Sequence, residues 1–244
     1  MDPRAREVLR VASAIPDRAL ASGYLRSVLR ELSLEDAADL VSVVHAASVA
    51  RDPTAAEAWL LIAIVLAEDS EEDLARGLAH MLRRRGNVEL ADAMASDDGR
   101  EIEEDASTVP DFGKGRPLSL GERKSVARTR DRHLLARVLR DPHPDVIRIL
   151  LGNPYLTEPD VIRVAARRPV RPEVLREICR SPRWMVRYRV RLALIKNPYL
   201  PLPLALRLVP QLTAPDQRDI AGSPELDARL REACATALSP RTLH

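Results

Sequence analysis

The sequence predicts an all-α fold of short helices that pack side by side in series, and three observations support this. The phrase Asn-Pro-Tyr-Leu begins at Asn153 and again, 44 residues later, at Asn197. Pairs of a short polar residue and proline begin at Asp141, Ser181 and Ser223, at spacings of 40 and 42 residues. The apolar content is mostly Leu, Val, Ala and Ile, with aromatic residues at only 3%, which favours helical packing over a β-sandwich. A repeat period in this range is typical of helical solenoids.

The recurring prolines predict where the helices begin and end. Asp141, Ser181 and Ser223 are good N-cap residues, and the proline after each suits the first helical position. The residue before a proline is disfavoured in a helix, so each pair also ends the preceding helix. Thr157 and Thr213 each precede an acid by three residues, as in a capping box. The predicted helices are 142–152, 157–168, 172–180, 182–196, 201–210, 214–221 and 224–238.

The first part of the chain, residues 1–96, reads as an acidic helical region. Ser33 and Ser70 are capping signals, and Gly86 follows three arginines, as at a left-handed helix exit. These helices either continue the solenoid in degenerate form or make a separate bundle, and we favour one continuous array. The predicted helices are 4–14, 17–31, 34–51, 54–67, 70–84 and 87–95.

Residues 97–117 are acidic and then rich in glycine and proline, with few large apolar side chains. Such a segment cannot bury enough surface to offset its ordering entropy, which predicts a flexible linker. A sharper alternative is an acidic arm that covers the basic half of the chain. Beyond the linker, residues 118–244 are predicted to form a basic repeat region that begins with a helix over 118–140.

Charge is distributed unevenly along the chain. Residues 1–110 contain 12 Lys and Arg against 22 Asp and Glu, whereas residues 111–244 contain 26 against 14. The net charge of +2 therefore hides an acidic half and a basic half. This asymmetry indicates an anionic partner for the basic half, or pairing of the two halves with each other.

The proline-punctuated helices of residues 118–238 resemble HEAT-like repeats and also the bacterial leucine-rich repeat variant. The resemblance implies a right-handed α-solenoid of HEAT-like helix pairs with irregular repeats, which binds protein or nucleic acid on one face. Some repeat-variant proteins hold an iron–sulphur cluster, but Cys179 and Cys234 are too far apart to carry that feature over. Some HEAT-like proteins are DNA glycosylases with aromatic residues and a carboxylate, and no acid accompanies Trp184 and Tyr188 here.

Motifs for catalysis, cofactors and metals are not found in the sequence. No histidine has a second ligand at metal-binding spacing, and there is no phosphate-binding loop or nucleophile elbow. We therefore expect no enzymatic activity and no cofactor. The longest apolar run, Ala58–Ala67, is too short to span a membrane and predicts a buried helix. Two cysteines and the absence of a signal sequence predict a cytoplasmic protein with no membrane partner.

The strongest candidate for a binding site lies between residues 181 and 191. On one continuous helix, Trp184, Arg187, Tyr188 and Arg191 would form a single stripe, with Arg183 beside it. Arginine and aromatic residues together suit a protein hot spot, and they also suit phosphate pairing and base stacking. The structural alternative is that the two aromatic residues pack between repeats.

These observations lead to two hypotheses for function. The first is a non-enzymatic scaffold or adaptor that binds another protein with an acidic surface on the repeat face. The alternative is a nucleic-acid-binding protein that uses the basic half, with or without base-processing activity. The sequence leaves the oligomeric state open.

Overall fold

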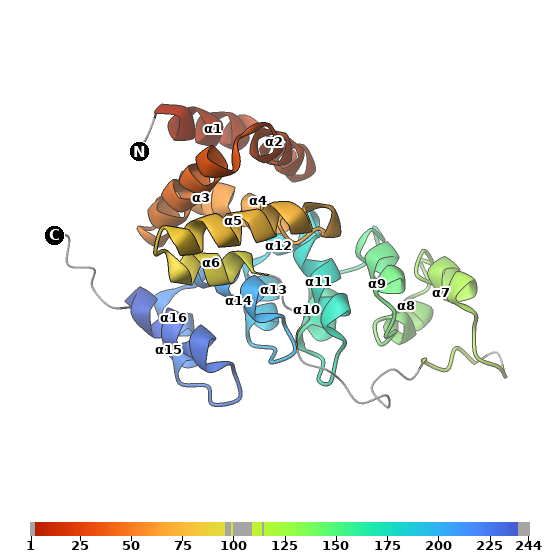
Figure 1. The fold of residues 1–244 in the computed structure, drawn as a ribbon. Helices are drawn as coiled ribbons and strands as arrows, with labels where there is room; N and C mark the ends of the chain where they lie inside the picture. The colour runs from red at the N-terminus through yellow and green to blue at the C-terminus, as the bar shows by residue number, and fades with distance from the viewer. Residues whose placement is uncertain (1–2, 96–98, 100–108, 114, 239–244) are drawn as a thin grey trace. The chain divides into compact units, whose positions relative to one another are not determined.

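The computed structural model of the chain describes residues 3–95, 99, 109–113 and 115–238 (Figure 1). These residues form α-helices, short 3₁₀ helices, turns and loops, with no β-strand among them, so the all-α prediction is confirmed. Two compact units divide the chain: unit 1 is residues 1–97 with 202–244, and unit 2 is residues 98–201. This grouping differs from the predicted division, in which residues 118–244 stay together. Most of the predicted linker, residues 97–117, lies outside the described residues.

Unit 1 is built around helix α4, which is apolar on all sides. The predicted buried helix is confirmed, because Trp59 and every residue from there to Ala67 are buried. Helix α4 contacts α1, α2, α3 and α14, so these helices surround it as in a bundle. The helices of unit 1 are α1 (Pro3–Ala14), α2 (Arg18–Glu31), α3 (Leu34–Val49), α4 (Pro53–Val65), η1 (Asp69–Glu71), α5 (Glu72–Arg84), α6 (Val88–Met94), α14 (Leu202–Leu208), η3 (Val209–Gln211), α15 (Ala214–Ala221) and α16 (Ala228–Leu238).

Specific hydrogen bonds explain why the chain from residue 202 onward joins the N-terminal helices. The indole Nε1 of Trp59 donates to the carbonyl oxygen of Arg207 at 2.8 Å. The Nε of Arg207 donates to the carbonyl oxygen of Ala93 at 2.6 Å. Nearby, the Nε2 of Gln211 donates to the carbonyl oxygen of Ala56 at 2.8 Å. Helix α14 and η3 are thereby held against α4 and α6 by contacts that helical periodicity does not encode.

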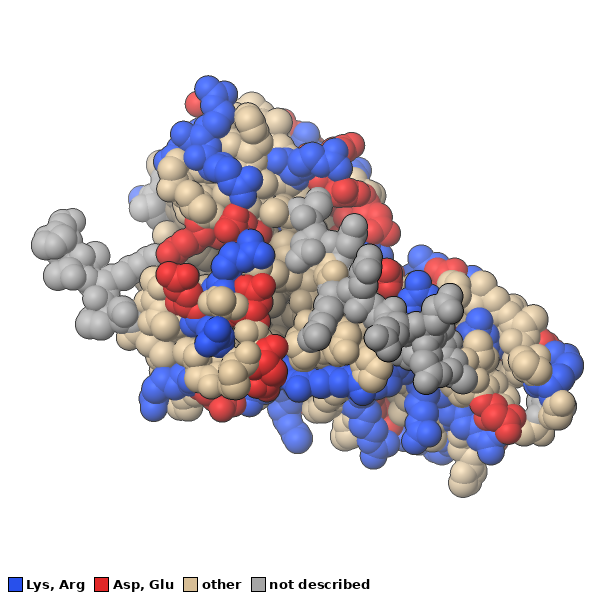
Figure 2. Space-filling model, turned by 60° about the horizontal axis from the view of Figure 1, so that its bottom comes forward, with Lys and Arg blue, Asp and Glu red and all other residues tan. Residues whose placement is uncertain are grey.

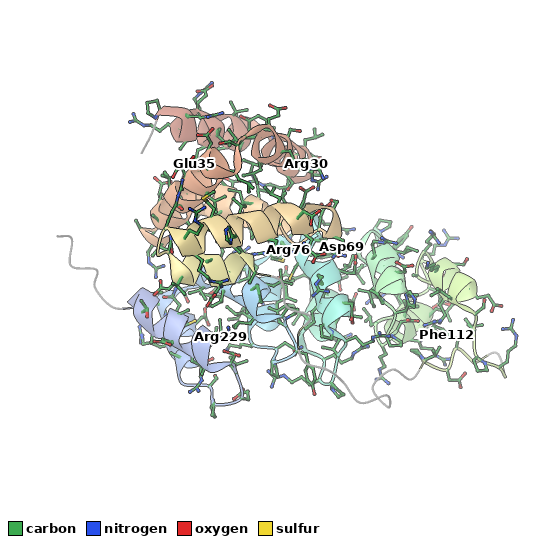
Figure 3. The ribbon with its side chains drawn as sticks, in the orientation of Figure 1. Arg30, Glu35, Asp69, Arg76, Phe112 and Arg229 are labelled. Atoms are coloured by element: carbon green, nitrogen blue, oxygen red, sulfur yellow. The ribbon has the colours of Figure 1, made fainter. Side chains whose placement is uncertain are left out.

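A buried carboxylate fixes the turn between α4 and α5. The side chain of Glu71 is 1% exposed and forms ion pairs with Arg26 and Arg30 of α2. Figure 3 labels Arg30 on this helix, and its Nε donates to Glu71 at 3.0 Å. A buried acid is tolerated only when it is paired and hydrogen-bonded, as it is here. The predicted left-handed exit of α5 is also confirmed, because Gly86 has a φ of 77°.

Unit 2 consists of short helices that pack against near neighbours in the chain. Helix α9 contacts α7 and α11, and α10 contacts α11 and α13. Two predicted helices are each broken in two: 118–140 becomes α7 and α8, and 182–196 becomes α12 and α13. The helices of unit 2 are α7 (Leu120–Val126), α8 (Arg132–Val138), α9 (Pro144–Leu151), α10 (Glu158–Ala166), α11 (Pro172–Cys179), α12 (Pro182–Met185) and α13 (Tyr188–Ile195).

The caps of unit 2 follow local chemistry only in part, and the predicted cap Ser181 makes no side-chain capping hydrogen bond. The side chains of Thr157 and Asp160 form the predicted capping box at α10. Helix α9, however, begins two residues later than predicted, because Asp141 is buried and accepts from Arg123 at 2.7 Å instead of capping. Phe112 is buried as well, and Figure 3 shows it next to α8.

Candidate polyanion-binding surface

The predicted binding stripe is interrupted by a helix break. Helix α12 ends at Met185 and α13 begins at Tyr188, so Trp184 and Tyr188 lie on different helices. The spacing that would align them holds only on one continuous helix. The single stripe is therefore a wrong prediction, although each of its residues has a clear place in unit 2.

Trp184 is a core residue rather than a surface anchor. Its side chain is 3% exposed, and its Nε1 donates to the carbonyl oxygen of Leu151 at 2.8 Å. The guanidinium of Arg183 lies over the indole ring, 4.5 Å from its centroid, and donates to the carbonyl oxygen of Asn153 at 3.0 Å. The tryptophan is therefore buried inside unit 2, which is the part of the structural alternative that concerns this residue.

Arg191 is also inside the unit, while Arg187 remains on its surface. Arg191 is 9% exposed and donates to the carbonyl oxygen of Met185 at 2.6 Å. Burial lowers the pKa of Arg191, and the nearby Tyr188, half-buried with its ring 5.5 Å from the guanidinium, opposes that shift. Of the five predicted residues, Arg183 and Arg187 are the two exposed ones.

Asn153 connects the loop after α7 to the loop after α9. Its Nδ2 donates to the carbonyl oxygens of Ala127 and Thr129 at 2.9 and 2.8 Å, and its Oδ1 accepts from the backbone N–H of Tyr155 at 2.8 Å. The side chain thereby provides partners for the carbonyl of the C-cap residue Ala127 and for a carbonyl of the loop that follows α7. Three hydrogen bonds on a residue that is 3% exposed make this a rigid connection.

Asn197 repeats the same arrangement after α13. Its Nδ2 donates to the carbonyl oxygens of Ala165 and Arg167 at 2.7 and 2.9 Å, and its Oδ1 accepts from the N–H of Tyr199 at 3.0 Å. The two asparagines thus explain the repeated sequence phrase by turn and cap chemistry alone. Neither asparagine side chain is available to a ligand.

The Asn153 connection creates a surface that we call the loop face. It consists of residues 127–131, 152–157 and 182–187, which Asn153, Arg183 and Trp184 hold together. Three short segments far apart in sequence are thereby placed next to one another. The exposed side chains that matter here are Arg128, Arg130, Tyr155, Arg183, Val186 and Arg187.

The loop face is strongly basic. It contains the four arginines named above and one acid, Asp131, whose carboxylate is engaged in capping α8. Within the described residues, Arg128 and Arg183 donate to carbonyl oxygens, and none of the four arginines forms an ion pair with a carboxylate. Their charges therefore remain available to a partner.

The same imbalance extends over unit 2 as a whole. Residues 115–201 contain 20 Lys and Arg against 8 Asp and Glu. Figure 2 shows basic side chains along the lower edge of this unit. Two of the acids, Asp141 and Asp160, are buried beneath arginine partners. Unit 2 therefore presents an excess of positive charge that its own acids do not neutralise.

Apart from charged side chains, the described residues provide few groups that could form a site. They contain no group of three His, Cys, Asp or Glu side chains that could hold a metal ion. Both cysteines are buried, and burial raises the pKa of Cys234 to about 12. No helix in the described part of the chain is long and apolar enough to cross a membrane.

Comparisons with known proteins find no relative. No family model, no curated protein and no solved structure matches the chain. The resemblance to HEAT-like repeats stays a prediction, and the argument for function depends on the residues of the loop face.

Sequence reasoning missed Tyr155, Arg128 and Arg130 as surface residues of one site. The predicted helices leave Tyr155 between 142–152 and 157–168, and they place the two arginines within one helix over 118–140. The available signal was Asp131, an N-cap residue ahead of the apolar residues of α8, which indicates a new helix start. The side chain of Asn153 brings these segments together, and its partners lie 24 and 26 residues earlier in the chain. Local sequence patterns do not reveal such a contact.

Proposed function

We propose that this protein is a binding scaffold whose unit 2 holds a polyanionic partner on the loop face. In this proposal unit 2 is a short right-handed α-solenoid of HEAT-like helix pairs. The recurrence of the asparagine connection at Asn153 and Asn197 supports that architecture, because each copy ties the end of one helix to the end of a later one. The scaffold positions its partner and does not transform it.

The observation that carries the proposal is that, among the described residues, the loop-face arginines have no carboxylate partner. A surface arginine without a carboxylate partner keeps its full charge, and several together raise the local concentration of anions. Arg128, Arg130, Arg183 and Arg187 meet that description within the described residues. Guanidinium groups suit both classes of partner, the carboxylates of an acidic protein and the phosphates of nucleic acid.

Binding of the full-length protein to fluorescein-labelled heparin, measured by anisotropy at several salt concentrations, tests the proposal. Heparin is a polyanion that favours neither class of partner. The loop-face variant changes Arg128, Arg130 and Arg187 to Gln, and the control variant changes three other exposed arginines of unit 2, Arg140, Arg168 and Arg171, to Gln. Arg183 is left intact because it packs on Trp184.

We expect the wild-type protein to bind more weakly as salt rises. Each lost charge contact lowers the slope of log affinity against log salt by about 0.7 to 0.9, so the loop-face variant should have a slope smaller by about 2. The control variant should retain most of the wild-type slope. Equal losses in the two variants would mean that unit 2 attracts anions by net charge alone, and the loop face would then not be the site.

A further inference from the structure

We infer that the partner of the loop face is a single-stranded nucleic acid, with one base stacked on Tyr155. This inference rests on the proposed function and names the class of polyanion. It starts from an exposed aromatic ring: Tyr155 is 52% exposed, in contrast to the buried Trp184.

The turn at Tyr155 is held by hydrogen bonds of the Tyr155 backbone, and these bonds do not involve its ring. Its N–H donates to Asn153 Oδ1 at 2.8 Å, and its carbonyl oxygen accepts from Arg132 Nη1 at 3.1 Å. The next residue, Leu156, is buried and anchors the chain. The backbone of Tyr155 is therefore fixed on both sides while the ring projects from it. A ring on a fixed backbone loses little conformational entropy when it binds a flat ligand.

The segments that contact the Tyr155 turn carry the arginines of the loop face. Arg128 and Arg130 adjoin Thr129, whose carbonyl oxygen binds Asn153, and Arg183 donates to the carbonyl oxygen of Asn153 itself. An aromatic platform between cationic groups is the arrangement by which proteins bind single strands: the charges follow the backbone while a base stacks on the ring. Bases in a duplex are already stacked on one another and do not offer their faces.

The apolar content of the loop face distinguishes nucleic acid from an acidic protein. Protein hot spots lie in desolvated pockets with apolar surroundings. The exposed large apolar side chains of unit 2, among the residues the structure describes, are only Tyr155 and Val186. A face with so little apolar area cannot exclude water from a contact with a protein. Phosphate pairing together with one stacked base does not require the exclusion of water from the whole face.

The test measures binding of the full-length protein to labelled ligands of matched charge. The ligands are single-stranded oligo-uridine and oligo-thymidine, a shorter duplex with the same total number of phosphates, and poly-glutamate with the same number of carboxylates. The variants are Tyr155→Ala and Tyr155→Phe, which keeps the ring, together with the loop-face arginine variant. Circular dichroism checks that each variant is folded.

We expect the single strands to bind more tightly than the duplex or poly-glutamate. Tyr155→Ala should weaken single-strand binding by about 5- to 100-fold, the range typical of a lost base–aromatic stack. Tyr155→Phe should stay within about twofold of the wild-type affinity, because a phenyl ring also stacks. The salt slope of Tyr155→Ala should match that of the wild type, whereas the arginine variant should lower it. A 4-thiouridine oligonucleotide should crosslink to residues 152–157.

Three results would contradict the inference or the proposed function. Equal affinity for duplex and single strand, with no effect of Tyr155→Ala, would overturn this inference and leave the polyanion proposal in place. Binding of poly-glutamate in preference to nucleic acid would do the same and identify an acidic protein as the partner. Failure to bind any polyanion, heparin included, would overturn the proposed function as well.

Discussion

Removal of the Asn153 side chain tests how unit 2 holds the loop face together. Asn153→Ala deletes two donated hydrogen bonds and one accepted bond, and leaves one buried carbonyl, one partly buried carbonyl and one partly buried N–H without these partners. A hydrogen bond contributes about 1 kcal/mol net, and an unsatisfied buried group costs about 1–3 kcal/mol. We therefore expect the free energy of unfolding of unit 2 to fall by about 2–4 kcal/mol. Asn197→Ala should cost a similar amount, because its three bonds are equivalent.

The assay should follow unit 2 separately from unit 1. Each unit contains one tryptophan, so a Trp59→Phe background leaves Trp184 as the fluorescent reporter of unit 2. Urea titrations of Asn153→Ala in that background give the change in unfolding free energy. A parallel titration of the Trp59→Phe protein alone supplies the reference.

Two control variants sharpen this prediction. Asn87 is exposed and accepts one hydrogen bond of 3.3 Å as the N-cap of α6, so Asn87→Ala should cost only about 0.5–1 kcal/mol. Asn153→Asp keeps the acceptor for Tyr155 but places a negative charge against two carbonyl oxygens, and should destabilise at neutral pH at least as much as Asn153→Ala. Losses of equal size for Asn153→Ala and Asn87→Ala would refute the idea that Asn153 connects the two loops.

Three further predictions follow from the geometry. Burial by itself would raise the pKa of Asp160, but hydrogen bonds from Arg132 and Thr157 outweigh it and hold the pKa below its usual value. Its ionised form therefore stabilises the fold above the unfolded-state pKa, and this stability is lost as pH falls through the lower, folded pKa; Asp160→Asn should flatten the acid limb of a stability profile. The thiol of Cys234, with a pKa of about 12, should resist alkylation at pH 8 until denaturant is added, as followed by mass spectrometry. Trp184→Phe should lower the unfolding free energy by about 1–2 kcal/mol through the lost hydrogen bond to Leu151, as measured by urea titration.

The features that sequence predicted well are those fixed by neighbouring residues. The capping box at Thr157 and the left-handed Gly86 were both read from a few adjacent side chains. The buried helix α4 follows from an apolar run with no polar side to expose. Asn153 also acts on a near neighbour, since its Oδ1 accepts from the N–H two residues further on, as asparagine often does in turns.

The features that sequence missed depend on contacts between distant residues. The break between α12 and α13 coincides with the bond from Arg191 to Met185 and with the burial of Trp184 against Leu151. Helical periodicity contains no information about either contact, so it predicts one continuous helix through this region. Likewise, the bonds of Arg207 to partners 114 and 148 residues away assign α14 to unit 1. The single stripe was wrong for this reason, whereas the role of Arg183 and Arg187 in binding stays a prediction.

The loop face also shows how a strongly basic unit can be stable. The last carbonyls of a helix carry partial negative charge and lack partners within the helix. In unit 2, arginines provide such partners at two helix ends: Arg128 donates to Lys124, and Arg167 donates to Leu139. A carbonyl oxygen accepts the hydrogen bond without cancelling the charge, as a carboxylate would. The same arginines therefore stabilise helix ends and keep the positive potential that a polyanion needs. A fold in which carboxylates paired with these arginines would have as many hydrogen bonds, but its surface would lack the positive potential.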